Sequence, residues 1–209
     1  MKVWITGGSG MVGKSLVEHS KSINYQILIP TRSELDLRNK EAIVNWLSAE
    51  RPDCVIHAAG KVGGIHANIA QPTEFLSENI EMGVNVITSC IKSGIKKLIN
   101  LGSSCMYPKE AQNPLKVESL LTSPLETTNE GYALSKIVCQ KLCEYHSKQN
   151  INSDFKTLIP CNIYGKFDSF NEEDSHLIPS IIRKVYEAKL NGDNQIKVWG
   201  KGTVRREFM

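Results

Sequence analysis

The sequence predicts an α/β protein built on a doubly wound parallel sheet, and two observations carry this prediction. Short runs rich in β-branched and apolar residues alternate with longer segments of helical period, which is the pattern of successive βαβ units. The strand-like runs are nearly continuously apolar, as at Val55-Ile56 and Leu98-Ile99, because strands covered by helices on both faces have no side that faces water. With 209 residues, 41% of them hydrophobic, the chain can bury a core.

Each element follows from a local pattern. Short apolar runs that end in polar residues or glycine predict strands at 2–6, 25–29, 53–58, 96–101, 155–159 and 195–199. Segments of helical period predict helices at 11–22, 39–50, 72–93, 131–149 and 176–190. Pro52, Pro72 and Gly94 mark boundaries between them. The connections 102–130 and 160–175 are long and follow strands, where open α/β sheets bind their ligands.

Composition excludes several classes of protein. Lys and Arg number 25 and Asp and Glu 22, and the resulting charge of +3 is scattered, so we expect no nucleic-acid partner. No apolar run reaches the roughly 18 residues of a membrane span, and the first residues lack a signal-peptide core. Six cysteines lie singly, and the one close pair, Cys139 and Cys143, lacks metal-site spacing. We expect a cytoplasmic protein with free thiols and no metal.

The first expected strand runs directly into a glycine-rich loop. Glycines stand at positions 7, 8, 10 and 13, and a helix is expected to follow at once. Glycine there permits a tight turn with positive φ, close approach of the backbone to a pyrophosphate, and close packing of helix and strand. The helix N-terminus would face the phosphates. A plain βα turn is the alternative, but the further βα units behind the loop favour a Rossmann-like dinucleotide site.

The end of the second expected strand indicates which dinucleotide binds. Sites that prefer NAD carry an acid here that binds the ribose hydroxyls. This chain has Arg32, whose guanidinium can pair with a 2′-phosphate and stack on adenine, so NADP is favoured. The alternatives are that Arg32 is a solvated loop residue, and that Glu34 or Asp36 binds a ribose or the adenine amino group.

Tyr132 and Lys136 lie four residues apart in a segment of helical period, so their side chains share one helix face. An adjacent ammonium favours the phenolate and is expected to bring the pKa of the tyrosine toward a useful range. The Ser-rich turn after the fourth strand places Ser103 and Ser104 where a hydroxyl can bind a carbonyl or its oxyanion. The alternatives are an ordinary helix face and serines that only satisfy turn backbone.

Three motifs together resemble the extended short-chain dehydrogenase/reductase family: TGGSGMVG at 6–13, LGSSCMYP at 101–108 and YALSK at 132–136. A wider set resembles the branch of this family that makes GDP-L-fucose. It comprises HAA at 57–59, KVGGI at 61–65, PCNIYG at 160–165, SHLIP at 175–179, VWG at 198–200 and REF at 206–208.

This resemblance implies that one active site inverts C3 and C5 of GDP-4-keto-6-deoxy-mannose and then reduces the C4 ketone with NADPH. It assigns the proton exchange to Cys105 and His176. A cation near Cys105 would raise its thiolate fraction, although a lone cysteine is often only a small buried hydrophobe. In the reduction Tyr132 gives the proton, Lys136 holds the nicotinamide ribose and tunes Tyr132, and Ser103 stabilises the oxyanion.

Cofactor and substrate contacts are implied in the same way. The expected NADP(H) contacts are Gly7, Gly8, Ser9, Gly10, Met11, Val12, Gly13, Arg32, Asp36, Leu101, Gly102, Ser103, Ser104, Lys136, Pro160, Cys161, Asn162, Ile163 and His176. The expected GDP-sugar contacts are Lys184, Trp199 and Arg206. Members of the family are commonly homodimers, so the helices at 72–93 and 131–149 are expected at an interface, although their apolar stripes equally fit a core.

The chain departs from the family pattern at Cys161, Lys166, Ser169 and Lys184, where threonine, proline, asparagine and often arginine are usual. A lysine at 184 keeps the charge but loses the bidentate fork, so a related sugar such as a GDP-heptose is an alternative substrate. We expect a cofactor domain at 1–165 and, at 166–209, the beginning of a smaller substrate domain whose remainder is missing. An inactive cofactor-binding fragment is a further alternative.

Overall fold

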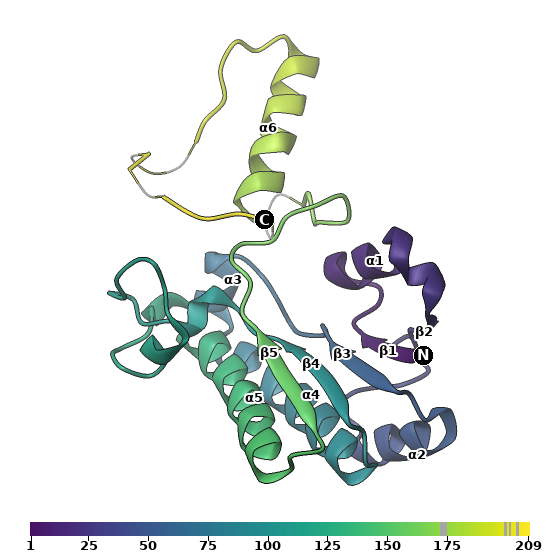
Figure 1. Cartoon of the computed structure of the whole chain (residues 1–209). Helices are drawn as coiled ribbons and strands as arrows, with labels where there is room; N and C mark the ends of the chain where they lie inside the picture. The colour runs from purple at the N-terminus through teal and green to yellow at the C-terminus, as the bar shows by residue number, and fades with distance from the viewer. Residues whose placement is uncertain (172–174, 199, 201, 204) are drawn as a thin grey trace.

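The computed structural model describes residues 1–171, 175–198, 200, 202–203 and 205–209. Its centre is a five-stranded parallel sheet in the order β2-β1-β3-β4-β5 (Figure 1). The strands are β1 (Lys2–Thr6), β2 (Gln26–Leu28), β3 (Cys54–His57), β4 (Lys97–Leu101) and β5 (Asp154–Leu158). The order reverses between β1 and β3, and at such a switch point a crevice opens beyond the carboxyl ends of the strands.

Helices pack on both faces of the sheet, which confirms the doubly wound fold. The helices are α1 (Met11–Glu18), α2 (Lys40–Glu50), α3 (Ile65–Ala70), α4 (Pro72–Lys92), α5 (Glu130–Gln149) and α6 (Leu177–Asn191). The main core forms where α2, α4 and α5 cover one face, around Trp4, Val55 and Leu98. A smaller core under α1 joins Val3 and Ile5 on the opposite face. No helix in the described part of the chain is long and apolar enough to cross a membrane.

Three expectations need correction. The strand expected at 195–199 is wrong over its described residues 195–198. They have no strand conformation because this segment lies outside the five-stranded sheet and has no neighbouring strand there to pair with its backbone. The first helix ends at Glu18, and a 3₁₀ turn, Ser20–Asn24, takes the place of its expected last turn. The short helix α3 was not expected. It begins after Gly64, and the Asn68 amide donates to the carbonyl oxygens of Gly63 and Gly64.

The segment after β5 carries the chain away from the sheet to α6, which stands apart from it (Figure 1). The chain returns to this segment at its end. The Asn162 N–H donates to Glu207 O at 3.2 Å and the Met209 N–H to Asn162 O at 3.0 Å, forming a parallel bridge between Asn162 and Phe208. This pairing fixes the backbone that forms one wall of the site described next.

Candidate active site

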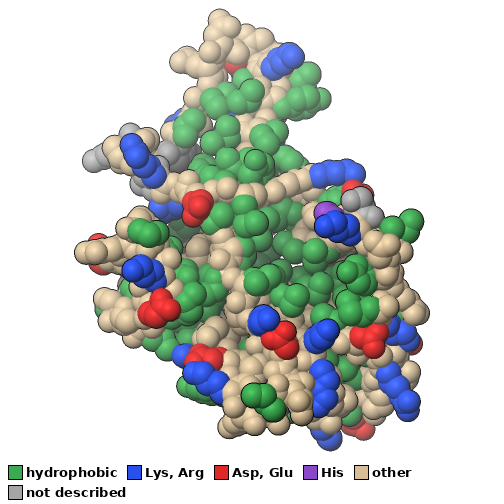
Figure 2. All heavy atoms as spheres, in the orientation of Figure 1, with side chains coloured by type: hydrophobic (Ala, Val, Ile, Leu, Met, Phe, Trp, Pro, Cys, Tyr) green, Lys and Arg blue, Asp and Glu red, His purple; other side chains and the backbone are tan. Residues whose placement is uncertain are grey.

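A cleft of about 3100 Å³ lies beyond the carboxyl ends of the strands, between the sheet and α6. In the space-filling view, hydrophobic side chains gather in this hollow (Figure 2). The residues expected at the site from the sequence line this one cleft wherever the structure describes them. Trp199, the remaining one, lies outside the described residues. The tertiary structure therefore brings together segments more than a hundred residues apart.

The glycine loop leaves no room for a side chain at Gly7 or Gly13. Gly7 has a φ of +70°, and a Cβ there would lie 2.8 Å from Ala59 Cα. A Cβ on Gly13 would overlap Gly7 O, so α1 can approach the loop this closely only because position 13 is glycine. Gly10, the N-cap of α1, supplies no side-chain hydrogen bond, so the first N–H groups of the helix are left for an anion. These features fit a dinucleotide pyrophosphate.

Beyond β2, the two carboxylates considered as partners of a ribose or of the adenine amino group, Glu34 and Asp36, already accept hydrogen bonds within the chain. Glu34 Oε2 accepts from the Thr31 N–H at 2.7 Å and from the Thr31 hydroxyl at 2.8 Å. Asp36 Oδ2 accepts from Arg38 NH2 at 2.6 Å, and hydrogen bonds from Arg38 lower the pKa of Asp36 to about 2. Arg32 is exposed and has no such partner among the described residues. Arg32 thus remains accessible to a phosphate.

Tyr132 and Lys136 lie one turn apart on α5, as their spacing predicts, but their electrostatics differ from the expectation. The Lys136 Nζ donates to Leu101 O at 3.1 Å and lies 5.6 Å from the centre of the Tyr132 ring. Burial, followed by the nearby Cys105 thiol, raises the pKa of Tyr132, so the shift toward neutrality expected from the adjacent ammonium is wrong. Burial also lowers the pKa of Lys136.

Cys105 lies in a 3₁₀ turn, Ser104–Met106, directly after β4. The Ser103 hydroxyl accepts from the Cys105 N–H over a long 3.5 Å, so this serine does serve the turn backbone. Burial raises the pKa of the Cys105 thiol, while the Ser103 hydrogen bond and the Lys136 charge oppose the rise. The lysine is therefore close enough to favour the thiolate, as expected, but burial has the larger effect on the pKa of the thiol.

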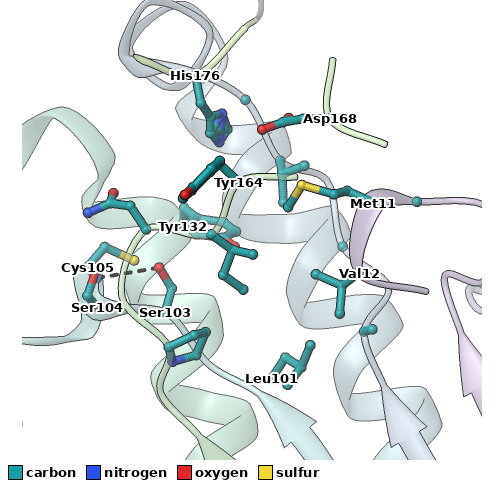
Figure 3. A pocket seen from close by; sticks show the side chains of 18 of the residues that line it. Met11, Val12, Leu101, Ser103, Ser104, Cys105, Tyr132, Tyr164, Asp168 and His176 are labelled. Carbon is teal, nitrogen blue, oxygen red and sulfur yellow. Dashed lines mark hydrogen bonds between the residues drawn. The ribbon is translucent and has the colours of Figure 1, made fainter. Parts of the chain in front are cut away.

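His176 is exposed at the N-cap of α6, and Figure 3 shows its ring pointing down into the cleft above Tyr164, with Tyr132 and Cys105 below. Tyr164 and Asp168 were missed as individual site residues, although Tyr164 belongs to the PCNIYG motif. Asp168 Oδ1 accepts from the Ser169 N–H at 2.8 Å, and its buried Oδ2 has no hydrogen-bond partner in the described structure. Both residues line the cleft from the segment after β5.

Side-chain contacts also join the segment after β5 to α1. The Lys166 Nζ lies 3.0 Å from Glu18 Oε2, and the Phe167 ring lies within cation–π distance of both Lys14 and Lys166. Lys166, one of the departures from the family pattern, thus has a structural contact. Farther along, the Lys184 Nζ donates to Lys197 O at 3.1 Å.

The comparisons identify relatives over the whole chain. The NAD dependent epimerase/dehydratase family matches residues 3–209. A Yersinia pseudotuberculosis protein named GDP-L-colitose synthase is 50% identical over 209 residues, covering 100% of this chain and 68% of the relative. An Azorhizobium caulinodans protein named GDP-L-fucose synthase is 50% identical over 208 residues, covering 100% and 66%. The chain thus spans about two thirds of the length of these relatives.

Solved structures give the same result. A Naegleria fowleri GDP-L-fucose synthetase bound to NADP superimposes with a TM-score of 0.88 at 31% identity, covering 100% of this chain and 68% of that one. A Campylobacter jejuni GDP-mannoheptose C4 reductase with NADP bound also gives 0.88 at 31%, covering 100% and 70%. The resemblance found in the motifs is confirmed, and the chain belongs to the NAD dependent epimerase/dehydratase family.

Proposed function

We propose that this protein is an NADP(H)-dependent epimerase-reductase that converts GDP-4-keto-6-deoxy-mannose to GDP-L-fucose. The observation that carries the proposal is the meeting of Ser103, Cys105, Tyr132 and His176 around one cleft that the glycine loop also lines (Figure 3). A simple reductase has no use for the thiol and the imidazole. Two relatives at 50% identity, named GDP-L-colitose synthase and GDP-L-fucose synthase, support the same interpretation.

The cofactor proposal rests on the cleft. When bound, the nucleotide would supply the hydride that adds to the C4 carbon. Gly7–Gly13 and the N-terminus of α1 would hold its pyrophosphate, and Arg32 would pair with its 2′-phosphate. Lys136 would hold the nicotinamide ribose, and residues 101–104 and 160–163, which line the cleft, would contact the nicotinamide.

Epimerisation requires a proton to leave one face of the sugar ring and another to be added on the opposite face. A C–H next to a ketone is acidic because the enolate places its charge on oxygen, so the Cys105 thiolate removes the proton and His176 returns one from the other side of the cleft. The Ser103 hydroxyl donates to the enolate oxygen. Because burial raises the pKa of Cys105, this step is expected to accelerate with pH.

The reduction step acts on the C4 ketone, whose oxygen also carries the charge of the enolate in the epimerisation. The Tyr132 hydroxyl donates its proton to the C4 oxygen, and its raised pKa means that the proton is present at neutral pH. Ser103 again stabilises the developing oxyanion. Lys184 and Arg206, which line the cleft, and Trp199 are proposed to bind the GDP-sugar, within a substrate-binding part at 166–209 that follows a cofactor-binding part at 1–165.

A second candidate is the same chemistry on another GDP-linked keto sugar. A relative named GDP-L-colitose synthase matches this chain as well as one named GDP-L-fucose synthase does. Solved GDP-heptose reductases superimpose equally well, and Lys184 lacks the bidentate fork that an arginine would offer the substrate.

We also propose a cytoplasmic homodimer. All six cysteines are free, which suits a reducing compartment. On α5, Leu134, Val138 and Tyr145 remain exposed although α4 packs against its other side, so these apolar side chains are available to a second copy. Light scattering on the purified protein measures the oligomeric state directly.

The function is tested by following NADPH oxidation with GDP-4-keto-6-deoxy-mannose and identifying the product by NMR, with Tyr132→Phe as the matched control. Formation of GDP-L-fucose that the variant does not support would establish the proposal. Turnover only with a different GDP-keto sugar would establish the second candidate. NADPH binding without turnover of any of these sugars would contradict both and leave a cofactor-binding module.

A further inference from the structure

Tyr164 is a large side chain of the cleft to which the proposed reaction gives no role. Figure 3 shows it between His176, which lies above it, and Cys105 and Tyr132, which lie below it. The residue lines the cleft and is 48% exposed, and its hydroxyl forms no hydrogen bond within the described part of the chain. A tyrosine in this state can bind a ligand both through its ring and through its polar end.

The backbone around Tyr164 is held on both sides. The Tyr164 N–H donates to Met209 O at 3.2 Å, and two residues earlier Asn162 pairs with the same end of the chain. The Tyr164 ring meets the Phe208 ring edge to face, with 6.3 Å between the ring centres. Two residues later, Lys166 joins the segment to α1 by an ion pair of 3.0 Å. Because these contacts already order the segment, a ligand that binds Tyr164 has little of its freedom left to remove.

The proposed epimerisation defines where the sugar lies. Proton exchange at opposite faces of the ring requires the hexose to lie between Cys105 and His176. Tyr164 lies between the same two residues (Figure 3), so it borders the hexose rather than the guanosine. The ring can pack against the C–H groups of the sugar, while the hydroxyl, for which no described residue competes, can bond to a sugar hydroxyl.

We propose that Tyr164 is a sugar-binding residue of this site, which packs against the hexose and hydrogen-bonds one of its hydroxyl groups. The contact holds the sugar at the level where Cys105 and His176 reach opposite faces. A structural role would need only the ring, because the contact with Phe208 does not involve the hydroxyl. This inference rests on the proposed function and adds a residue that recognises the sugar part of the GDP-sugar.

The test is calorimetric titration of the protein, in the presence of NADPH, with GDP and with GDP-L-fucose, the proposed product, which the reduced cofactor cannot reduce further. Tyr164→Phe keeps the ring and removes only the hydroxyl. It should weaken GDP-L-fucose binding about five- to tenfold, which corresponds to one hydrogen bond, and leave GDP binding unchanged. Tyr186→Phe removes the hydroxyl of an exposed tyrosine on α6 that does not line the cleft, and it should change neither affinity.

Steady-state kinetics give a second measurement. Because the contact holds the sugar both before and during the reaction, Tyr164→Phe should raise KM for the keto sugar with little change in kcat. A lower kcat at unchanged KM would overturn the inference, since the hydroxyl would then act only in the chemical steps.

Two binding results would also overturn it and leave the proposed function intact. One is an unchanged affinity of Tyr164→Phe for GDP-L-fucose. The other is an equal loss of affinity for GDP and for GDP-L-fucose, which would place the contact on the nucleotide. If the unsubstituted protein binds no GDP-sugar, the proposed function fails and this inference fails with it.

Discussion

Lowering the pH from 7.5 to 5.5 should destabilise the protein through His57, a side chain buried at the end of β3. Its Nδ1 shares a hydrogen bond of 2.8 Å with the Thr6 hydroxyl, and that hydroxyl also accepts from the Ala59 N–H. Burial, and then the charge of Lys136, lowers the pKa of His57 to about 3. In the unfolded chain this pKa returns to about 6.5.

The direction of this pH effect follows from whether the folded or the unfolded chain binds the proton. Between about pH 6.5 and pH 3 the unfolded chain protonates His57 while the folded protein does not, so stability falls as the pH falls through this window. From pH 7.5 to 5.5 the free energy of unfolding should fall by about 1.4 kcal/mol, and this figure depends almost entirely on the pKa of His57 in the unfolded chain. Asp36 and Glu144, whose pKa values lie at about 2, contribute little there, because unfolded carboxyls titrate near pH 4.

The assay is urea unfolding followed by tryptophan fluorescence at the two pH values. His57→Asn keeps an acceptor for Thr6 and leaves a smaller side chain, so it should cost roughly 1–3 kcal/mol at both pH values. It should also abolish most of the difference between them. His146→Asn, at a far more exposed histidine whose pKa is also lowered, is the control and should retain the difference. An equal pH dependence in the unsubstituted protein and in His57→Asn would refute the reasoning.

Three further results are expected. Gly13→Ala forces a Cβ against Gly7 O and should weaken NADPH binding more than tenfold in a fluorescence titration, whereas Gly165→Ala, with nothing within 4 Å, should not. Cys105→Ser should abolish solvent deuterium uptake at C3 and C5 of the sugar and still reduce a pre-epimerised substrate. Deuterium uptake that survives this change would remove the thiol from the mechanism. In the parent protein the rate of uptake should still be rising at pH 9, because burial raises the pKa of this thiol. Tyr132→Phe should lower the reduction rate by about 10²–10⁴ with little change in NADPH affinity, and a rate near that of the parent would contradict its role as proton donor.

Features that depend on a few neighbouring residues could be predicted from the sequence. The glycine loop needs only the spacing of Gly7, Gly10 and Gly13, and the structure shows the positive φ and close packing that this spacing demands. The Tyr132 and Lys136 pair needs only helical period. Alternation of strands and helices was likewise enough for the parallel, doubly wound sheet.

Features that depend on residues far away in the chain could not be predicted from the sequence. Residues 195–198 have a strand-like composition but meet no strand, while 162–164 pair with the end of the chain. The pKa of Tyr132 rises because the walls of the cleft remove water from its hydroxyl, and no local spacing encodes that burial. Local sequence therefore determined the glycine loop, the five strands of the sheet and the identity of the reactive groups. Tertiary structure alone decided which charges are paired and which are buried, because desolvation and pairing depend on segments far apart in the chain.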